Sequence, residues 1–182
     1  MTERDILALI KDDKWMMDII GIAASLQLKD WLIGAGFVRN KVWDHLSGNE
    51  RKEVDTRDID LVYFDPNGND EKADERLSEK MKIETGIEWE IVNEFYAHKF
   101  NGIPPYSSTE DAISQWPETV TAIGVTIDEN GELELIAPYG IDDLVNFTVR
   151  LSPKFKGSME VLKGRVAKKK WQEKWPKITI AD

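Results

Sequence analysis

The stretch DIDLVYF, from Asp58 to Phe64, decides the fold because it is the clearest strand in the sequence. It is rich in β-branched and aromatic residues, and the turn signal DPNGND follows it. Side chains alternate along a strand, so Asp58 and Asp60 share one face while the apolar residues Ile59, Leu61 and Tyr63 share the other. The stretch therefore predicts a strand with one apolar face and a carboxylate pair on the opposite face.

The pair Asp58 and Asp60 has two interpretations. If both faces of the strand are covered, neighbouring carboxylates repel each other and require protonation, solvent or a cation. Two hard oxygen ligands at this spacing suit Mg²⁺, which binds one or two carboxylates together with waters and substrate phosphates. Alternatively, both acids lie exposed at the start of the strand, with Arg57 as their partner.

A second motif, GAGFVRN from Gly34 to Asn40, lies between an apolar segment and a predicted helix. Glycines one residue apart suit a tightly packed turn, because they lack a Cβ atom. They also suit a turn that holds a phosphate against backbone amides at a helix N-terminus. The glycines alone do not decide between packing and phosphate binding.

The order of the predicted elements is typical of an α+β fold, in which helices cover a mixed sheet of about four or five strands. We expect a single domain over residues 1–182, with an N-terminal helix over 2–26, a core over 28–137 and a C-terminal helical tail over 139–176. Thr2 and Asp5 predict a capped start for the first helix. The predicted strands cover 28–33, 58–64, 89–92, 120–127 and 133–137, and the other predicted helices cover 37–46, 71–81, 109–116, 141–147 and 159–175.

The composition excludes several classes of protein. With 24 Lys and Arg against 34 Asp and Glu, the net charge is −10, which argues against general binding of duplex DNA. The sequence has no cysteine, so disulfides and thiolate metal sites are excluded, and a cytoplasmic protein is expected. No uncharged apolar run approaches the roughly 18–20 residues that cross a bilayer, so we expect no membrane partner.

The two motifs together resemble the nucleotidyltransferases of the DNA polymerase beta superfamily. In that superfamily a glycine turn opens a helix whose N-terminal amides hold the β- and γ-phosphates of a nucleotide. A DxD strand binds Mg²⁺, and a third carboxylate comes from a neighbouring strand. Here the turn is Gly34-Ala35-Gly36, whereas glycine followed by glycine or serine is more usual.

A longer series of motifs resembles one bacterial family of small, stand-alone, nucleotidyltransferase-like proteins. The series consists of GAGFVRNKVWDHL, DIDLVYFD, PYSSTEDAISQWPETVTAIGV, APYGIDDL and the tail pattern R-x-x-K-x-x-W-x-x-x-WP. The resemblance covers most of the chain and implies a polymerase beta-like fold with an NTP substrate and Mg²⁺ or Mn²⁺.

The resemblance also implies roles for individual residues. Arg39 and Asn40 follow the glycines, close to where a triphosphate lies, and Arg39 either forks onto a γ-phosphate or pairs with Asp44 or another surface acid. The third carboxylate is either Glu90 or Glu94. We favour Glu90 because it lies inside a predicted strand, whereas Glu94 stands where the family tends to have glutamine.

A basic run near the C-terminus is the one concentration of cations in this acidic sequence. It either attracts a triphosphate or an RNA end, or forms a solvated helix face. Trp171 and Trp175, four residues apart, are expected to clamp the last helix to the core. The basic residues are Lys163, Arg165, Lys168, Lys169 and Lys170.

The sequence therefore predicts a metal-dependent nucleotidyltransferase that transfers a nucleoside monophosphate from an NTP to an unidentified acceptor. Asp58, Asp60 and Glu90 are expected to hold the metal, and the turn Gly34-Ala35-Gly36 is expected to hold the phosphates. The alternative is a non-catalytic module that keeps the fold to sense a nucleotide or to bind a protein.

Overall fold

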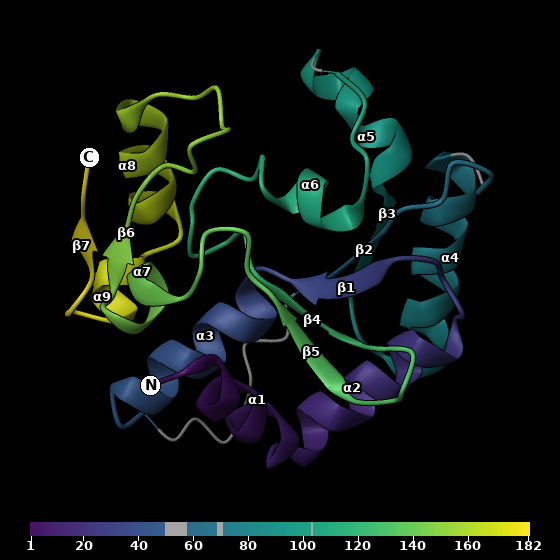
Figure 1. Cartoon of the computed structure of the whole chain (residues 1–182), viewed down its shortest axis with the longest axis horizontal. Coiled ribbons are helices and arrows are strands. Elements are labelled where there is room, and N and C mark those ends of the chain that lie inside the picture. The colour runs from purple at the N-terminus through teal and green to yellow at the C-terminus, as the bar shows by residue number, and fades with distance from the viewer. Residues whose placement is uncertain (50–57, 69–70, 103) are drawn as a thin grey trace.

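The computed structural model describes residues 1–49, 58–68, 71–102 and 104–182. It confirms the predicted α+β class, with helices on a mixed sheet (Figure 1). The strands are β1 (Trp31–Gly34), β2 (Ile59–Tyr63), β3 (Trp89–Asn93), β4 (Gly124–Ile127), β5 (Leu133–Ile136), β6 (Thr148–Val149) and β7 (Thr179–Ile180). The helices are α1 (Glu3–Lys11), α2 (Lys14–Ser25), α3 (Gly36–Leu46), α4 (Glu71–Thr85), α5 (Glu94–Asn101), α6 (Thr109–Ile113), α7 (Asp142–Val145), α8 (Met159–Lys168) and α9 (Trp171–Lys174).

The main sheet has the strand order β3-β2-β1-β4-β5. Strands β2 and β3 run parallel, and the other neighbouring pairs are antiparallel. The register places Asp60 of β2 opposite Glu90 of β3. Two carboxylates on adjacent strands therefore meet on one face, because directly paired residues point to the same side of a sheet.

The alternation predicted for β2 divides its residues between the two faces of the sheet. Ile59, Leu61 and Tyr63 are buried in the main core, against helices α1 to α4. Val62 points to the other face, where it packs with Leu32 and with residues of the α6 region. Helices α5 and α6 lie on this second side in Figure 1. Asp60, the carboxylate of β2, points to this less apolar face, and Asp58 directly precedes the strand.

The predicted N-terminal helix over 2–26 is wrong as a single element. Thr2 caps α1 as predicted, because its side chain accepts from the amide of Asp5 and the Asp5 carboxylate accepts from the amide of Thr2. The Asp13 carboxylate then accepts from the amide of Met16 at 3.1 Å and begins a second helix, α2. A side chain that caps a new helix competes with continuation of the preceding one, which explains the break.

The predicted C-terminal helix over 159–175 is also divided. Lys170 has a φ of 55° in the left-handed region and separates α8 from α9. Strands β6 and β7 form a short parallel pair that the sequence did not predict, and β7 follows α9 along the chain. The helical tail predicted over 139–176 thus contains three short helices and one of these strands.

Aromatic packing joins this tail to α3. The Trp43 side chain is fully buried, and its Nε1 donates a hydrogen bond to the carbonyl of Leu144 at 2.9 Å. The rings of Trp171 and Trp175 meet the Trp43 ring edge to face, with centroids 5.6 Å and 5.0 Å away. The predicted clamp is confirmed.

Helix α5 was not predicted. Its N-cap is Asn93, whose side chain accepts a hydrogen bond from the amide of Phe95 at 3.1 Å.

Within the part of the chain that the structure describes, no helix has the length and apolar character needed to cross a membrane.

Candidate active site

The two glycines of the turn between β1 and α3 have different environments. A Cβ atom on Gly34 would lie 2.8 Å from the ring of Trp116, too close for any side chain without movement of that ring. Gly34 also pairs with Gly124 across the sheet. The packing interpretation therefore explains Gly34.

Gly36 lies at the first residue of α3, beneath polar side chains. A Cβ atom there would lie 3.3 Å from Nδ2 of Asn40 and 3.5 Å from Nη2 of Arg39. Among the described residues, no side chain caps the N-terminus of α3. The amides of an uncapped helix N-terminus favour an anion, and here a guanidinium lies beside them.

Ala35 adopts an unusual backbone conformation between the two glycines. Its φ of 53° and ψ of −118° lie where residues with a side chain are rarely found. The Ala35 amide donates to the carbonyl of Ile123 at 2.9 Å, and the Ala35 carbonyl accepts from the amide of Arg39 at 3.1 Å. These contacts hold the strained turn in place.

Arg39 is buried, so it is not a surface charge. Its Nη1 donates to Oγ1 of Thr121 at 2.9 Å, and its Nε and Nη2 donate to Oδ1 of Asn40. The Arg39 Cζ atom lies 4.3 Å from the ring centroid of Trp171. Burial lowers the pKa of Arg39 to about 10, opposed by the charges of Glu118, Asp60 and Asp58, so the side chain stays protonated at neutral pH.

Arg39 does not form the ion pair with Asp44 that the sequence offered as the alternative. Asp44 accepts a hydrogen bond from Nε1 of Trp175 at 2.7 Å. Asp44 thus supports the packing of the tail on α3.

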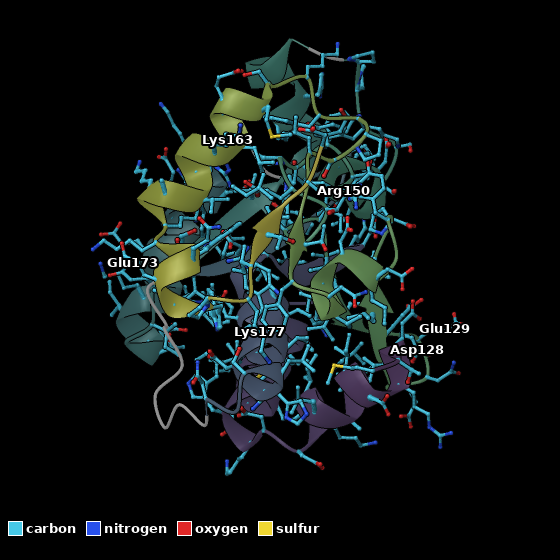
Figure 2. The ribbon with its side chains drawn as sticks, turned by 90° about the vertical axis from the view of Figure 1, so that its left-hand side faces the viewer. Asp128, Glu129, Arg150, Lys163, Glu173 and Lys177 are labelled. Atoms are coloured by element: carbon cyan, nitrogen blue, oxygen red, sulfur yellow. The ribbon has the colours of Figure 1, made fainter. Side chains whose placement is uncertain are left out.

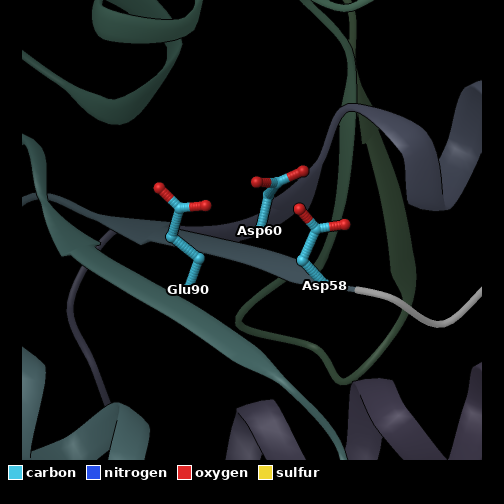
Figure 3. Close-up of side chains that lie close together, drawn as sticks. All are labelled: Asp58, Asp60 and Glu90. Atoms are coloured by element: carbon cyan, nitrogen blue, oxygen red, sulfur yellow. The ribbon is translucent and has the colours of Figure 1, made fainter. Parts of the chain in front are cut away.

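Three carboxylates converge on the exposed face of β2 and β3. Asp58, Asp60 and Glu90 each offer one oxygen atom, and these atoms all lie within 4.8 Å of one another. Figure 3 shows the three side chains rising from the same side of the two strands. The structure therefore brings together the carboxylates that the sequence singled out.

Among the residues that the structure describes, no ion pair compensates the charge of this acidic cluster; Arg57, the partner in the alternative interpretation, lies outside them. Burial, followed by the charges of Asp58 and Glu90, raises the pKa of Asp60 to about 6, although Arg39 and Lys169 act in the opposite direction. Two oxygens that bind one Mg²⁺ at about 2.1 Å lie at most ~4.2 Å apart, so small side-chain rotations would suffice to bind the ion. The uncompensated charge and the all-oxygen donor set fit a hard divalent cation.

Glu94, the other candidate for the third carboxylate, lies elsewhere. It begins α5, is only 5 % exposed and hydrogen-bonds with Trp116. Burial raises its pKa to about 7. Glu94 is absent from the acidic cluster that the described residues form.

Residues of the C-terminal segment also approach the site. Arg165 forms an ion pair with Glu118, a carboxylate with no exposed side-chain surface. Lys169 is exposed, but partial desolvation and the nearby charges of Arg39 and Arg165 lower the pKa of its ammonium group, while the charges of Asp58 and Asp60 act in the opposite direction. Lys169 belongs to the basic run, for which the sequence offers a solvated helix face as the alternative.

The comparisons with known proteins agree with this geometry. A family model described as nucleotidyltransferase matches residues 21–180. The chain belongs to this nucleotidyltransferase family. A search of the curated proteins finds no match.

Solved structures extend the comparison. An NMR structure described as a CCA-adding enzyme head domain is 35 % identical to this chain, with a TM-score of 0.86, and the match covers 100 % of this chain and 96 % of that one. The structure of a CCA-adding enzyme with ATP is 15 % identical with a TM-score of 0.52, over 93 % of this chain and 47 % of that enzyme. A complex with CTP is 14 % identical with a TM-score of 0.50, over 96 % and 48 %. The chain spans about half the length of the two nucleotide-bound enzymes, and at 14–15 % identity their similarity shows the fold alone.

Replacing Ala35 by glycine should stabilise the protein. Glycine adopts this backbone conformation without strain, and we expect the free energy of unfolding to rise by about 1 kcal/mol after the entropic cost of glycine is deducted. Urea denaturation measures the change. The control Ala24→Gly in α2 should lower stability by about 1 kcal/mol, and an equal loss at Ala35 would contradict the strained turn.

The buried Glu94 should make stability fall as pH rises. Its folded pKa of about 7 lies above the ordinary 4.5, so the destabilisation is absent below pH 4.5, grows between these values and is complete above pH 7. Glu94→Gln should therefore raise the free energy of unfolding by about 2–3 kcal/mol near pH 8.5 and leave it unchanged near pH 4. Glu129→Gln, an exposed change in the turn labelled in Figure 2, should give a flat difference. A flat difference for Glu94→Gln would show that this carboxyl is not destabilised by burial.

Removing one charge from the acidic cluster should stabilise the metal-free protein. Asp60→Asn eliminates repulsion with Asp58 and Glu90, and we expect an increase of about 1–3 kcal/mol in the free energy of unfolding at neutral pH. Mg²⁺ should raise the melting temperature of the unaltered protein but not that of the variant. An equal Mg²⁺ effect on both proteins would place the metal elsewhere.

Proposed function

We propose that the protein transfers a nucleoside monophosphate from an NTP to an acceptor hydroxyl or phosphate in a Mg²⁺-dependent reaction. One observation carries the proposal. The carboxylates of Asp58, Asp60 and Glu90 converge on one face of the sheet, and Arg39, whose charge acts on Asp60, overlies the N-terminus of α3. A cation site beside an anion site is the arrangement that a metal–triphosphate complex requires.

The acidic residues and the basic residue of the site would bind different parts of the metal–nucleotide complex. Asp58, Asp60 and Glu90 would hold Mg²⁺ or Mn²⁺. When bound, the ion would supply positive charge against the phosphoryl oxygens. The amides at the start of α3 and the Arg39 guanidinium would hold the β- and γ-phosphates.

The proposed reaction is a single displacement at the α-phosphorus. The acceptor oxygen forms a bond to this phosphorus, while the bond from the α-phosphorus to the oxygen that bridges to the β-phosphorus breaks. Pyrophosphate leaves with that electron pair, and the acceptor proton passes to a carboxylate of the acidic cluster. Orientation by Arg39 and the turn keeps the acceptor and the leaving group in line.

An RNA 3′ end is the first acceptor to test, since the 35 % identical structure is described as a CCA-adding enzyme head domain. The net charge of −10 argues against broad affinity for polyanions. A small molecule or a protein hydroxyl is the alternative acceptor. The choice affects which product is labelled and leaves the reaction class unchanged.

The test is transfer of label from α-³²P NTPs to RNA, protein and small molecules of a cell extract, with Mg²⁺ present. We expect a labelled product, and Asp58→Ala with Asp60→Ala should reduce its formation by about 10³-fold or more. The control changes Glu129→Ala with Glu132→Ala remove the same charge from the exposed β4–β5 turn and should leave transfer intact. Nucleotide binding without any labelled product would instead support the non-catalytic sensing function.

A further inference from the structure

Lys169 of the basic run lies at the junction between α8 and α9, four residues after Arg165 and two residues before Trp171. Helix α8 ends at Lys168, Lys169 is its C-cap, and Lys170 reverses the backbone with a φ of 55°. The next residue, Trp171, places its ring 4.3 Å from the guanidinium carbon of Arg39. The junction therefore lies against the start of the phosphate helix α3.

An ion pair fixes the position of α8. Arg165, one turn before Lys169, pairs with the fully buried Glu118, which lies in the segment between α6 and β4. Two bonds from a guanidinium to one carboxylate restrict the orientation of both groups. The helix that carries Lys169 is thus attached to the core rather than loosely solvated.

The cations at this junction differ in how their charges are balanced. The Glu118 carboxylate compensates Arg165. Arg39 makes its hydrogen bonds, among the described residues, with the neutral groups of Thr121 and Asn40. In the same part of the chain no carboxylate lies within ion-pairing distance of the Lys169 ammonium. Arg39 and Lys169 together leave positive charge beside the acidic cluster.

We infer that Lys169 is a second cation, beside Arg39, for the β- and γ-phosphates of the NTP and for the pyrophosphate that leaves. The inference rests on the proposed function and extends it to the C-terminal segment. Like charges at close range are unfavourable when no ligand is present, and this explains why the charges of Arg39 and Arg165 act against protonation of Lys169. A polyphosphate between Lys169 and Arg39 removes that repulsion.

The rest of the basic run provides matched controls. Lys163 lies six residues before Lys169, which corresponds to about 9 Å along a helix. Figure 2 labels Lys163 toward one end of the α8–α9 segment and Glu173 of α9 toward the other. Lys168 and Lys169 are both exposed, but Lys168 points about 100° away from Lys169 around the helix axis. Replacing either lysine changes the net charge by the same amount as replacing Lys169.

The test is calorimetric titration with inorganic tripolyphosphate and Mg²⁺, which needs no knowledge of the preferred base. Loss of one charged contact is expected to weaken binding about 10- to 100-fold in Lys169→Ala. Lys169→Arg should bind within about threefold of the unaltered protein because it keeps the charge. Lys163→Ala and Lys168→Ala should each change affinity by less than about threefold, because Lys163 lies about 9 Å away along the helix and Lys168 points to another side of it, so that solvent and salt screen both charges from the phosphates.

Several outcomes would overturn the inference. Equal weakening by all three alanine changes would show a general charge effect. Unchanged tripolyphosphate binding by Lys169→Ala, with loss of binding to a single-stranded RNA, would assign Lys169 to the acceptor instead. If Lys169→Ala binds normally while Asp58→Ala with Asp60→Ala does not, the inference fails and the proposed function stands. If the unaltered protein binds no tripolyphosphate, both fail.

Discussion

The structure depends most on the burial of one indole, Trp43 of α3. The side chain has no exposed surface, and its single polar atom is satisfied by the carbonyl of Leu144. Burying an indole of this size contributes about 4–6 kcal/mol by area. Because Trp43 lies on the helix that begins at the phosphate turn, the contacts that bury it also fix the direction of that turn. The tail supplies two of those contacts, through Trp171 and Trp175.

The acidic cluster differs from two other carboxylates of the described residues, each of which has a cation beside it. The buried carboxylate of Glu118 has its cation in Arg165, and the Asp143 carboxylate has Arg150 at 2.9 Å. In the acidic cluster, by contrast, burial and then the charges of Asp58 and Glu90 raise the pKa of the central member, Asp60. A divalent metal bound to a polyphosphate would correct the negative excess there and the positive excess at Arg39 together. The unbalanced charges lower the stability of the free protein, and binding of a ligand that neutralises them raises its stability.

Periodicity predicted the parts of the site that lie on strands. The alternation in DIDLVYF placed Asp58 and Asp60 on the polar face, and Glu90 was favoured because it lies inside a strand. The register of two parallel strands brings Glu90 opposite Asp60. For these residues, the local sequence pattern was sufficient to predict the face of the sheet on which each side chain lies, because side chains alternate between the two faces along a strand.

The sequence could not predict features that depend on contacts between distant segments. Gly34 is glycine because Trp116 packs on it, and Gly36 lies under Arg39 and Asn40. Breaks in the terminal helices arise from single residues, Asp13 and Lys170, that helical periodicity does not distinguish from their neighbours. The contact of Trp171 with Arg39, two residues after Lys169, likewise follows from tertiary packing rather than from the composition of a basic run.

The contact between Arg39 and Trp171 has a thermodynamic consequence for the chain as a whole. Since the Arg39 guanidinium packs on the ring of Trp171 in α9, the orientation of Arg39 depends on whether the C-terminal segment is docked on the core. Linkage is reciprocal, so an anion that favours this orientation of Arg39 must favour docking of the segment by the same free energy. Anion binding and docking of the C-terminal segment are therefore thermodynamically coupled.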